Sequence, residues 1–321
     1  MYEAFFGLRE RPFDLTPNPR FLLLTGKHRE ALSNLQYGIT SRRGLTLLIG
    51  DAGTGKTTLV RAAVQEFERQ GAAIAYLNNP TLSRIEFCEF LAAAFKLDPT
   101  VASSKTRLLT GLGRVLEERR AAGLITALII DEAQGLPDEL LEEVRLLANI
   151  ETATDKLLPI VLAGQPELAD RLNQVSLRQL KQRVALRCLL VPLDARETSE
   201  YIAGRIRVAG GNSALVFTRQ AVDAIFRRSG GIPRLISVIC DNALISGFAA
   251  DRRPVSLDIV EDVCRDFDLS PRPAVAAPAH PPPVRQTGGA AAAKAPEPSV
   301  AKKDHRSLFE HFSVRRRFSL F

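Results

Sequence analysis

Short runs of apolar residues alternate, between residues 45 and 191, with longer stretches in which apolar positions recur every three or four residues. The short runs predict buried strands, and the longer stretches predict amphipathic helices. The predicted strands are Leu45–Ile49, Ala73–Leu77, Ala127–Ile130, Ile160–Ala163 and Cys188–Val191. The predicted helices are Thr57–Arg69, Arg84–Phe95 and Lys105–Arg120. This alternation is typical of an α/β fold, in which helices cover both faces of a parallel sheet.

The pattern changes after Pro192, where no further apolar strand follows and helical spacing dominates. The predicted helices there are Ala195–Val208, Thr218–Arg228, Pro233–Gly247 and Leu257–Arg265. They indicate a small, all-helical second domain. We therefore expect an α/β domain over residues 1–193 and a helical lid over residues 194–268.

The remaining residues differ in composition from the rest of the chain. Residues 271–321 hold eight of the 19 prolines, and nine Lys and Arg against three acids, which leaves +1 of the total charge of +7 for residues 1–270. Such a segment buries too little apolar surface to order itself, so we expect a disordered linker over residues 269–303. The nearly neutral folded part gives no electrostatic argument for nucleic-acid binding.

The basic tail, residues 304–321, interleaves aromatic and aliphatic side chains with arginines. Such a segment can lie on an anionic membrane surface or in a groove of a partner protein. An unstructured tail without a partner is the alternative. Neither a signal peptide nor an apolar run of membrane-spanning length is present, and the four cysteines are scattered, so we expect a cytoplasmic protein with reduced thiols.

The segment GDAGTGKT, Gly50–Thr57, joins a predicted strand to a predicted helix and matches the P-loop pattern. Its glycines allow backbone N–H groups to surround phosphates, Lys56 can reach the outer phosphates, and Thr57 can hold Mg²⁺. This predicts an ATP and Mg²⁺ site. The predicted nucleotide-binding residues are Gly50, Asp51, Ala52, Gly53, Thr54, Gly55, Lys56, Thr57, Thr58 and Arg234.

The segment LIIDEAQ places two acids at the end of a predicted strand, after the P-loop in the chain. In P-loop ATPases such acids serve Mg²⁺ and the attacking water. We therefore predict that Asp131 holds Mg²⁺ together with Thr57, and that Glu132 activates water.

Polar residues also follow two other predicted strands. Gln165 can orient water or contact the terminal phosphate, and the alternative is a turn residue before Pro166. Asn78 can hold Glu132 in an idle orientation, although a turn role with its neighbours is favoured. Both alternatives stay open at this stage.

Arginines precede the fifth predicted strand and open a lid helix. Arg183 and Arg187 are spaced to share a helical face, close to Arg178. In an oligomeric ATPase an arginine there can stabilise charge in a neighbour's site, and the alternative is a solvated stripe. The segment GGIPR places Arg234 in the first turn of a lid helix, from which it can reach back to the phosphates.

Over residues 1–268 the chain resembles AAA+ ATPases of the general secretion pathway protein A type. The resemblance lies in the order of five segments, GDAGTGKT, LIIDEAQ, LAGQPEL, LKQRVALRCLLVPL and GGIPRLI. They follow the opening MYEAFFGLRERPFDLTPNPRFLLLTGKHREAL. The resemblance implies a P-loop AAA+ fold, ATP hydrolysis, Arg183 as arginine finger, Gln165 as first sensor and Arg234 as lid sensor. It also implies that residues 21–28 lie near the adenine. We expect a homo-oligomer.

Relatives of this type are associated with secretion, pilus and exopolysaccharide systems of the cell envelope, which suggests the same kind of partner here. Secretion-type members commonly continue into a membrane helix and a peptidoglycan-binding domain, and the sequence shows neither, so we expect a shorter, cytoplasmic form. Two alternatives remain: an ATPase that assists DNA transactions, as in transposition, and a nucleotide-gated scaffold with negligible turnover.

Overall fold

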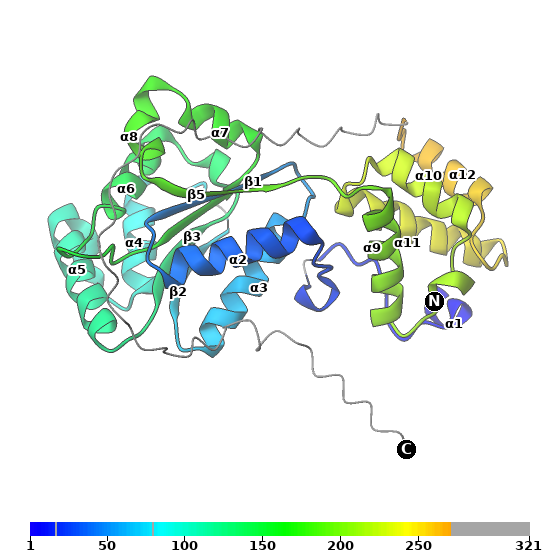
Figure 1. Ribbon diagram of the computed structural model, residues 1–321, viewed down its shortest axis with the longest axis horizontal. Coiled ribbons are helices and arrows are strands. Elements are labelled where there is room, and N and C mark those ends of the chain that lie inside the picture. Colours follow the sequence, from blue (N-terminus) through cyan, green and yellow to red (C-terminus); the bar gives the residue numbers. More distant parts are fainter. Residues whose placement is uncertain (17, 79, 271–321) are drawn as a thin grey trace, which may run out of the picture. The chain divides into compact units, whose positions relative to one another are not determined.

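The computed structural model describes residues 1–16, 18–78 and 80–270. Within them, one five-stranded parallel sheet has the order β2-β3-β4-β1-β5 (Figure 1). The strands are β1 (Leu45–Gly50), β2 (Ala73–Leu77), β3 (Thr126–Ile130), β4 (Ile160–Gly164) and β5 (Val184–Leu190). The predicted parallel sheet is confirmed, and β1 to β4 agree with their predicted bounds to within one residue.

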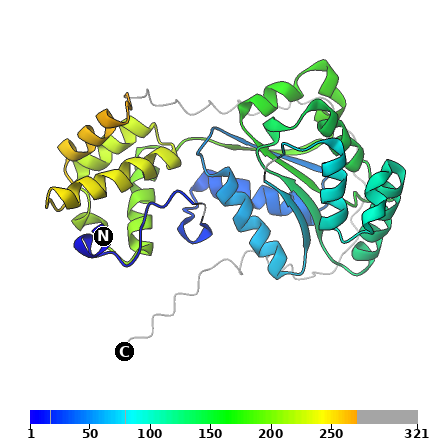
Figure 2. The ribbon, with the colours of Figure 1, turned by 180° about the vertical axis from the view of Figure 1, so that it is seen from behind.

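Helices cover both faces of the sheet (Figures 1 and 2). Strand residues point alternately to opposite faces. In β1, Leu47 therefore packs into one apolar cluster and Leu48 into the other. The first cluster is shared with α4 (Arg84–Ala94), α5 (Lys105–Ala121), α6 (Asp138–Leu147), α7 (Pro166–Leu172) and α8 (Arg178–Lys181), and the second with α2 (Gly26–Thr40) and α3 (Lys56–Arg69).

Strand β5 lies at an edge of the sheet and begins four residues before the predicted Cys188. Its outward side chains, which include Arg187, are exposed and interrupt the apolar run on which the prediction depended. The predicted helical face shared by Arg183 and Arg187 is wrong, because Arg183 follows α8 in a turn and Arg187 lies in the strand.

Two long helices were not predicted. In α2 the buried positions include His28 and Gly38, whose polar or small side chains hide the apolar spacing. In α6 the buried residues are Leu140, Leu141, Val144 and Leu147, a spacing that does indicate a helix and was overlooked.

The four predicted helices after Pro192 are present, each within two residues of its predicted bounds. They are α9 (Ala195–Val208), α10 (Arg219–Ser229), α11 (Pro233–Ala249) and α12 (Leu257–Asp266). Asp194 and Glu197 form a capping box at the start of α9, and Gly230 ends α10 with a left-handed φ of 60°. Strong caps explain why these boundaries were predictable.

The N-terminal segment packs with these helices. Tyr2 and Phe6 of α1 (Tyr2–Phe6), together with Phe13 and Phe21, share one apolar cluster with residues of α9 to α12. The hydroxyl of Tyr2 donates to Asp241 at 2.5 Å. The apolar core of the lid helices is therefore completed by residues from the N-terminal segment. The domain bounds 1–193 and 194–268 stay a prediction.

Short 3₁₀ turns connect several elements: η1 (Pro19–Phe21), η2 (Pro99–Ser103), η3 (Ala133–Gly135), η4 (Val175–Leu177) and η5 (Ser213–Leu215). Across the described residues, no helix combines the length and the hydropathy that a membrane crossing requires. The predictions for the linker and the tail concern positions 271–321, outside the described residues.

Candidate functional site

The loop between β1 and α3 is a phosphate cradle. Gly53 and Gly55 have φ angles of +82° and +100°, which turn the backbone in a way that L side chains rarely permit. Gly50 lies so close to β5 that an added Cβ would be 2.8 Å from the carbonyl of Leu190. The hydroxyl of Thr54 donates to the carbonyl of Asp51 at 2.8 Å and closes the turn.

Lys56 opens α3 and is buried. Its Nζ donates to the carbonyl oxygens of Gly50 at 2.7 Å and Asp51 at 3.1 Å. Burial lowers the pKa of Lys56, and the nearby carboxylates of Glu132 and Asp131 oppose that shift. A cation that is partnered mainly by carbonyls inside a cradle of N–H groups is suited to bind phosphate oxygens.

Asp131 directly follows β3 and is 1% exposed. Its Oδ2 accepts from the hydroxyl of Thr57 at 2.7 Å and from the hydroxyl of Tyr76 at 3.3 Å, and its Oδ1 accepts from the backbone N–H of Glu132 at 3.0 Å. The hydroxyl of Thr57 and the carboxylate of Asp131 are oxygen donors, which Mg²⁺ prefers, so these residues fit that ion.

Tyr76 of β2 was missed by the sequence analysis. Burial and the charge of Asp131 raise the pKa of Tyr76. A tyrosine near the carboxyl end of a strand that neighbours the acid-bearing strand is the signal that could have found it.

Glu132 follows Asp131 with a left-handed φ of 52° and lies on the wall of a cavity. Its Oε2 accepts from the side chain of Gln134 at 2.5 Å and from that of Gln165 at 3.4 Å. Among the described contacts of this carboxylate, the partners are these glutamines and not Asn78. The backbone of Gln165 precedes Pro166 at the start of α7, and its side chain faces Glu132, while its contact with water or the terminal phosphate stays a prediction.

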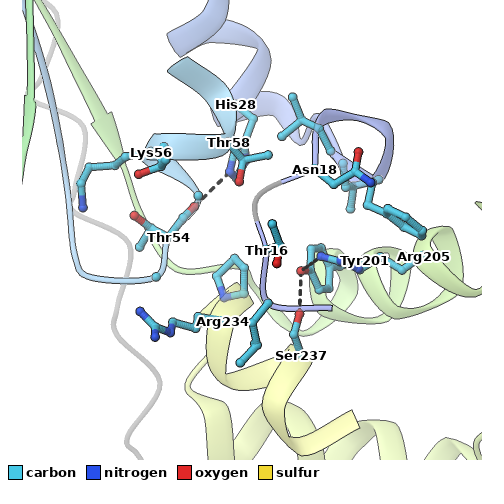
Figure 3. A pocket seen from close by; sticks show the side chains of 18 of the residues that line it. Thr16, Asn18, His28, Thr54, Lys56, Thr58, Tyr201, Arg205, Arg234 and Ser237 are labelled. Atoms are coloured by element: carbon cyan, nitrogen blue, oxygen red, sulfur yellow. Dashed lines mark hydrogen bonds between the residues drawn. The ribbon is translucent and has the colours of Figure 1, made fainter. Parts of the chain in front are cut away.

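The cavity has a volume of about 300 Å³. At one end, called the phosphate end, it is lined by residues 53–58 and Glu132; at the other, called the lid end, by residues of the N-terminal segment, α9 and α11 (Figure 3). Arg234 lines it too, and its backbone N–H donates to the carbonyl of Gly53 at 3.2 Å. The lid helix therefore contacts the phosphate cradle directly.

Arg205 of α9 organises the lid end. It donates to the carbonyls of Pro12 at 2.5 Å and Asp14 at 3.2 Å, and to the hydroxyl of Tyr201 at 2.6 Å. Its guanidinium lies 4.9 Å from the ring centre of Phe21. The hydroxyls of Tyr201 and Ser237 are 2.9 Å apart (Figure 3). These contacts fasten the N-terminal segment to α9 where both line the cavity.

His28 connects the first turn of α2 to the phosphate cradle. Its Nε2 lies 3.3 Å from the carbonyl of Thr54 (Figure 3). Its Nδ1 lies 2.8 Å from the hydroxyl of Thr25. A carbonyl only accepts, so Nε2 carries the proton and Nδ1 accepts from Thr25. Burial lowers the pKa of His28, which favours this neutral form.

Arg183 does not meet the other predicted site residues. In the parallel pair, Val184 of β5 lies opposite Leu45 of β1, and Leu190 lies opposite Gly50. Arg183 is therefore at the amino end of these strands, about 20 Å along them from Gly50 at 3.3 Å per residue. Arg178 and Arg187 are exposed like Arg183, and the role of an arginine finger stays a prediction for all three.

Comparison with known proteins shows what this chain is similar to. An AAA domain matches residues 39–172. General secretion pathway protein A of Aeromonas hydrophila is 44% identical over 250 residues, which are 78% of this chain and 45% of that protein. The chain thus spans a little less than half the length of this relative.

Two solved structures are similar in fold. The ORC2 protein of Aeropyrum pernix, in complexes with ADPNP and ADP, has a TM-score of 0.59 and 18% identity over 80% of this chain and 71% of that chain. Cdc6p of Pyrobaculum aerophilum has a TM-score of 0.60 and 16% identity over 77% of this chain and 70% of that chain. At these identities the similarity shows the fold alone.

Proposed function

Because this chain belongs to the AAA ATPases and is a relative of general secretion pathway protein A, we propose that it binds Mg-ATP at residues 50–58 and hydrolyses it. One observation carries the proposal: the hydroxyl of Thr57 and the carboxylate of Asp131 meet at 2.7 Å, next to Glu132 on the cavity wall. The fold shared with an ADPNP-bound protein agrees with this site.

The geometry suggests a role for each side chain. The N–H groups of the cradle and Lys56 hold the phosphates, and Arg234 reaches them from the lid. Mg²⁺, held by Thr57 and Asp131, neutralises phosphate charge when bound. Glu132 accepts a hydrogen bond from the attacking water and polarises it, while Gln165 steadies the same carboxylate.

The proposal is tested by separating binding from turnover. Lys56→Ala removes the buried cation and should weaken ATP binding at least about tenfold, because charge-assisted contacts to phosphate are lost. Glu132→Gln should keep ATP bound and lower turnover by about 10² or more, the usual size of a lost general base. Fluorescent-nucleotide titration and phosphate release measure the two effects.

Glu139→Gln is the matched control, since it makes the same change at an exposed position of α6. It should leave both quantities unchanged. Phosphate release by Glu132→Gln at the parent rate would show that the base is assigned wrongly.

The name of the relative leads to the wider proposal, that this ATPase serves a secretion, pilus or polysaccharide machine of the cell envelope from the cytoplasmic side as a homo-oligomer. Peripheral contact with a membrane or partner through residues 304–321 is part of the same proposal. The near-neutral charge of residues 1–270 gives no support to nucleic acid as the partner.

A further inference from the structure

The side chain of Gln134 lies between Glu132 and the start of α7. Its Nε2 donates to Oε2 of Glu132 at 2.5 Å, and its Oε1 accepts from the backbone N–H of Gln165 at 3.1 Å. A backbone N–H can only donate, so the oxygen of the carboxamide must face Gln165 and its NH₂ group must face Glu132. The orientation of the carboxamide is therefore fixed by its surroundings.

Gln134 is itself held in place. Its backbone carbonyl accepts from Nη1 of Arg171 in α7 at 2.8 Å, and the same nitrogen donates to the carbonyl of Leu136 at 2.7 Å. Arg171 also forms an ion pair with Asp138. Gly164 leaves room for the carboxamide, because a Cβ there would lie 3.0 Å from Oε1 of Gln134. The position of Gln134 thus depends on the join between β4 and α7.

These contacts determine the orientation of the Glu132 carboxylate. Among the described residues, hydrogen bonds to its carboxylate come from Gln134 and Gln165, and both reach Oε2. Oε1 is thereby left to accept a hydrogen bond from another donor, and Glu132 lines the cavity. The left-handed backbone of Glu132 is strained and also needs neighbours that hold it.

We propose that Gln134 is a positioning residue that turns the free oxygen of Glu132 toward the attacking water and ties that orientation to the β4–α7 join. The inference rests on the proposed ATPase function, since it assigns Gln134 a part in the water-activating step. It adds a residue that the P-loop and the acidic pair do not include.

The test begins with Gln134→Ala. The turnover number should fall about tenfold to a hundredfold, the range expected when a base loses its orientation. The KM for ATP and the affinity for a fluorescent ATP analogue should change little, because Gln134 is not among the described residues that line the cavity. Gln134→Glu places a second carboxylate beside Glu132 and should lower turnover at least as much.

Gln70→Ala is the matched control. Gln70 donates its Nε2 to Oε1 of Glu66 at 3.0 Å, so it has the same chemistry as Gln134 but lies on the exposed end of α3. Its removal should leave turnover unchanged.

A double-mutant cycle separates positioning from a general structural effect. If Gln134 acts through Glu132, then Gln134→Ala adds no further loss to Glu132→Gln. The inference is overturned if Gln134→Ala turns over like the parent, if it lowers the rate of Glu132→Gln by the same factor, or if it weakens nucleotide binding in proportion. Failure of the ATPase proposal is distinct, because Glu132→Gln alone would then hydrolyse ATP like the parent.

Discussion

The two ends of the cavity are built in different ways. At the phosphate end, the loop from Gly50 to Thr58 is one continuous segment. Asp131 and Glu132 reach this loop from the end of β3, which β4 separates from β1 in the sheet. At the lid end, Arg205 fastens the carbonyls of Pro12 and Asp14, which are 193 and 191 residues away in the chain. The cradle at one end is a single local segment, whereas the lid end is assembled by contacts between segments far apart in the chain.

Because the two ends are built differently, substitutions at each end should affect different properties of the protein. The phosphate cradle keeps its shape through short turns and buried backbone, so single changes there should alter chemistry more than stability. The lid end depends on a few long-range contacts of Arg205, each worth about 1 kcal/mol. Changes there should alter nucleotide affinity more than chemistry.

The largest effect is expected for Arg183→Ala, which tests whether the phosphate end needs a residue from a neighbouring molecule. Arg183→Ala should lower turnover by about 10³, because an arginine finger supplied by a neighbour has that effect on the transition state. The parent rate per protomer should rise with protein concentration. Mixing Arg183→Ala with Lys56→Ala should restore part of the activity, since a composite site then has an intact cradle and an intact arginine.

Arg178→Ala and Arg187→Ala identify the finger, because these residues are equally exposed. A rate independent of concentration, together with an active Arg183→Ala protein, would remove the idea that neighbours share the site.

A smaller effect is expected at the lid end. Arg205→Lys keeps the charge but loses the planar fork that reaches several acceptors, so the KM for ATP should rise about tenfold while the turnover number changes less than about twofold. Arg207→Lys, an exposed neighbour on α9, should change neither. A fall in turnover without a change in KM would contradict the proposal that the lid end sets nucleotide affinity and the phosphate end sets the chemistry.

The smallest effect concerns the link between α2 and the cradle. The folded state keeps His28 neutral, so its pKa is lower than in the unfolded chain, where it titrates near 6.5. The unfolded state then binds more protons as pH falls below about 6.5, and the free energy of unfolding should drop by up to about 1.4 kcal/mol per pH unit until the folded pKa is reached.

His28→Asn should flatten the stability profile in the range where pH falls below about 6.5, as measured in denaturant titrations. Lys27→Asn, at an exposed neighbouring position of α2, is the control and should leave the slope as it is. Equal slopes for the parent and His28→Asn would show that the buried imidazole does not set the pH dependence.

The sequence predicted what short segments determine. The cradle, the acidic pair and the lid helices follow from glycines, strand ends and caps such as Asp194. Tyr76, Gln134 and Arg205 were missed because their importance comes from partners that packing brings near. The start of β5 was misplaced because an edge strand exposes alternate side chains, whereas the signal of α6 was present and simply overlooked.

The burial of the N-terminal segment among the lid helices has a consequence for biosynthesis. Tyr2 contacts Asp241, a residue made 239 positions later. At a general rate of about 5–20 residues per second, Tyr2, Phe6 and Phe13 wait tens of seconds on the ribosome before their final neighbours exist. During that time these aromatic side chains are open to chaperones or to other nascent chains. Slow or interrupted translation prolongs this exposure and should therefore reduce the yield of folded protein.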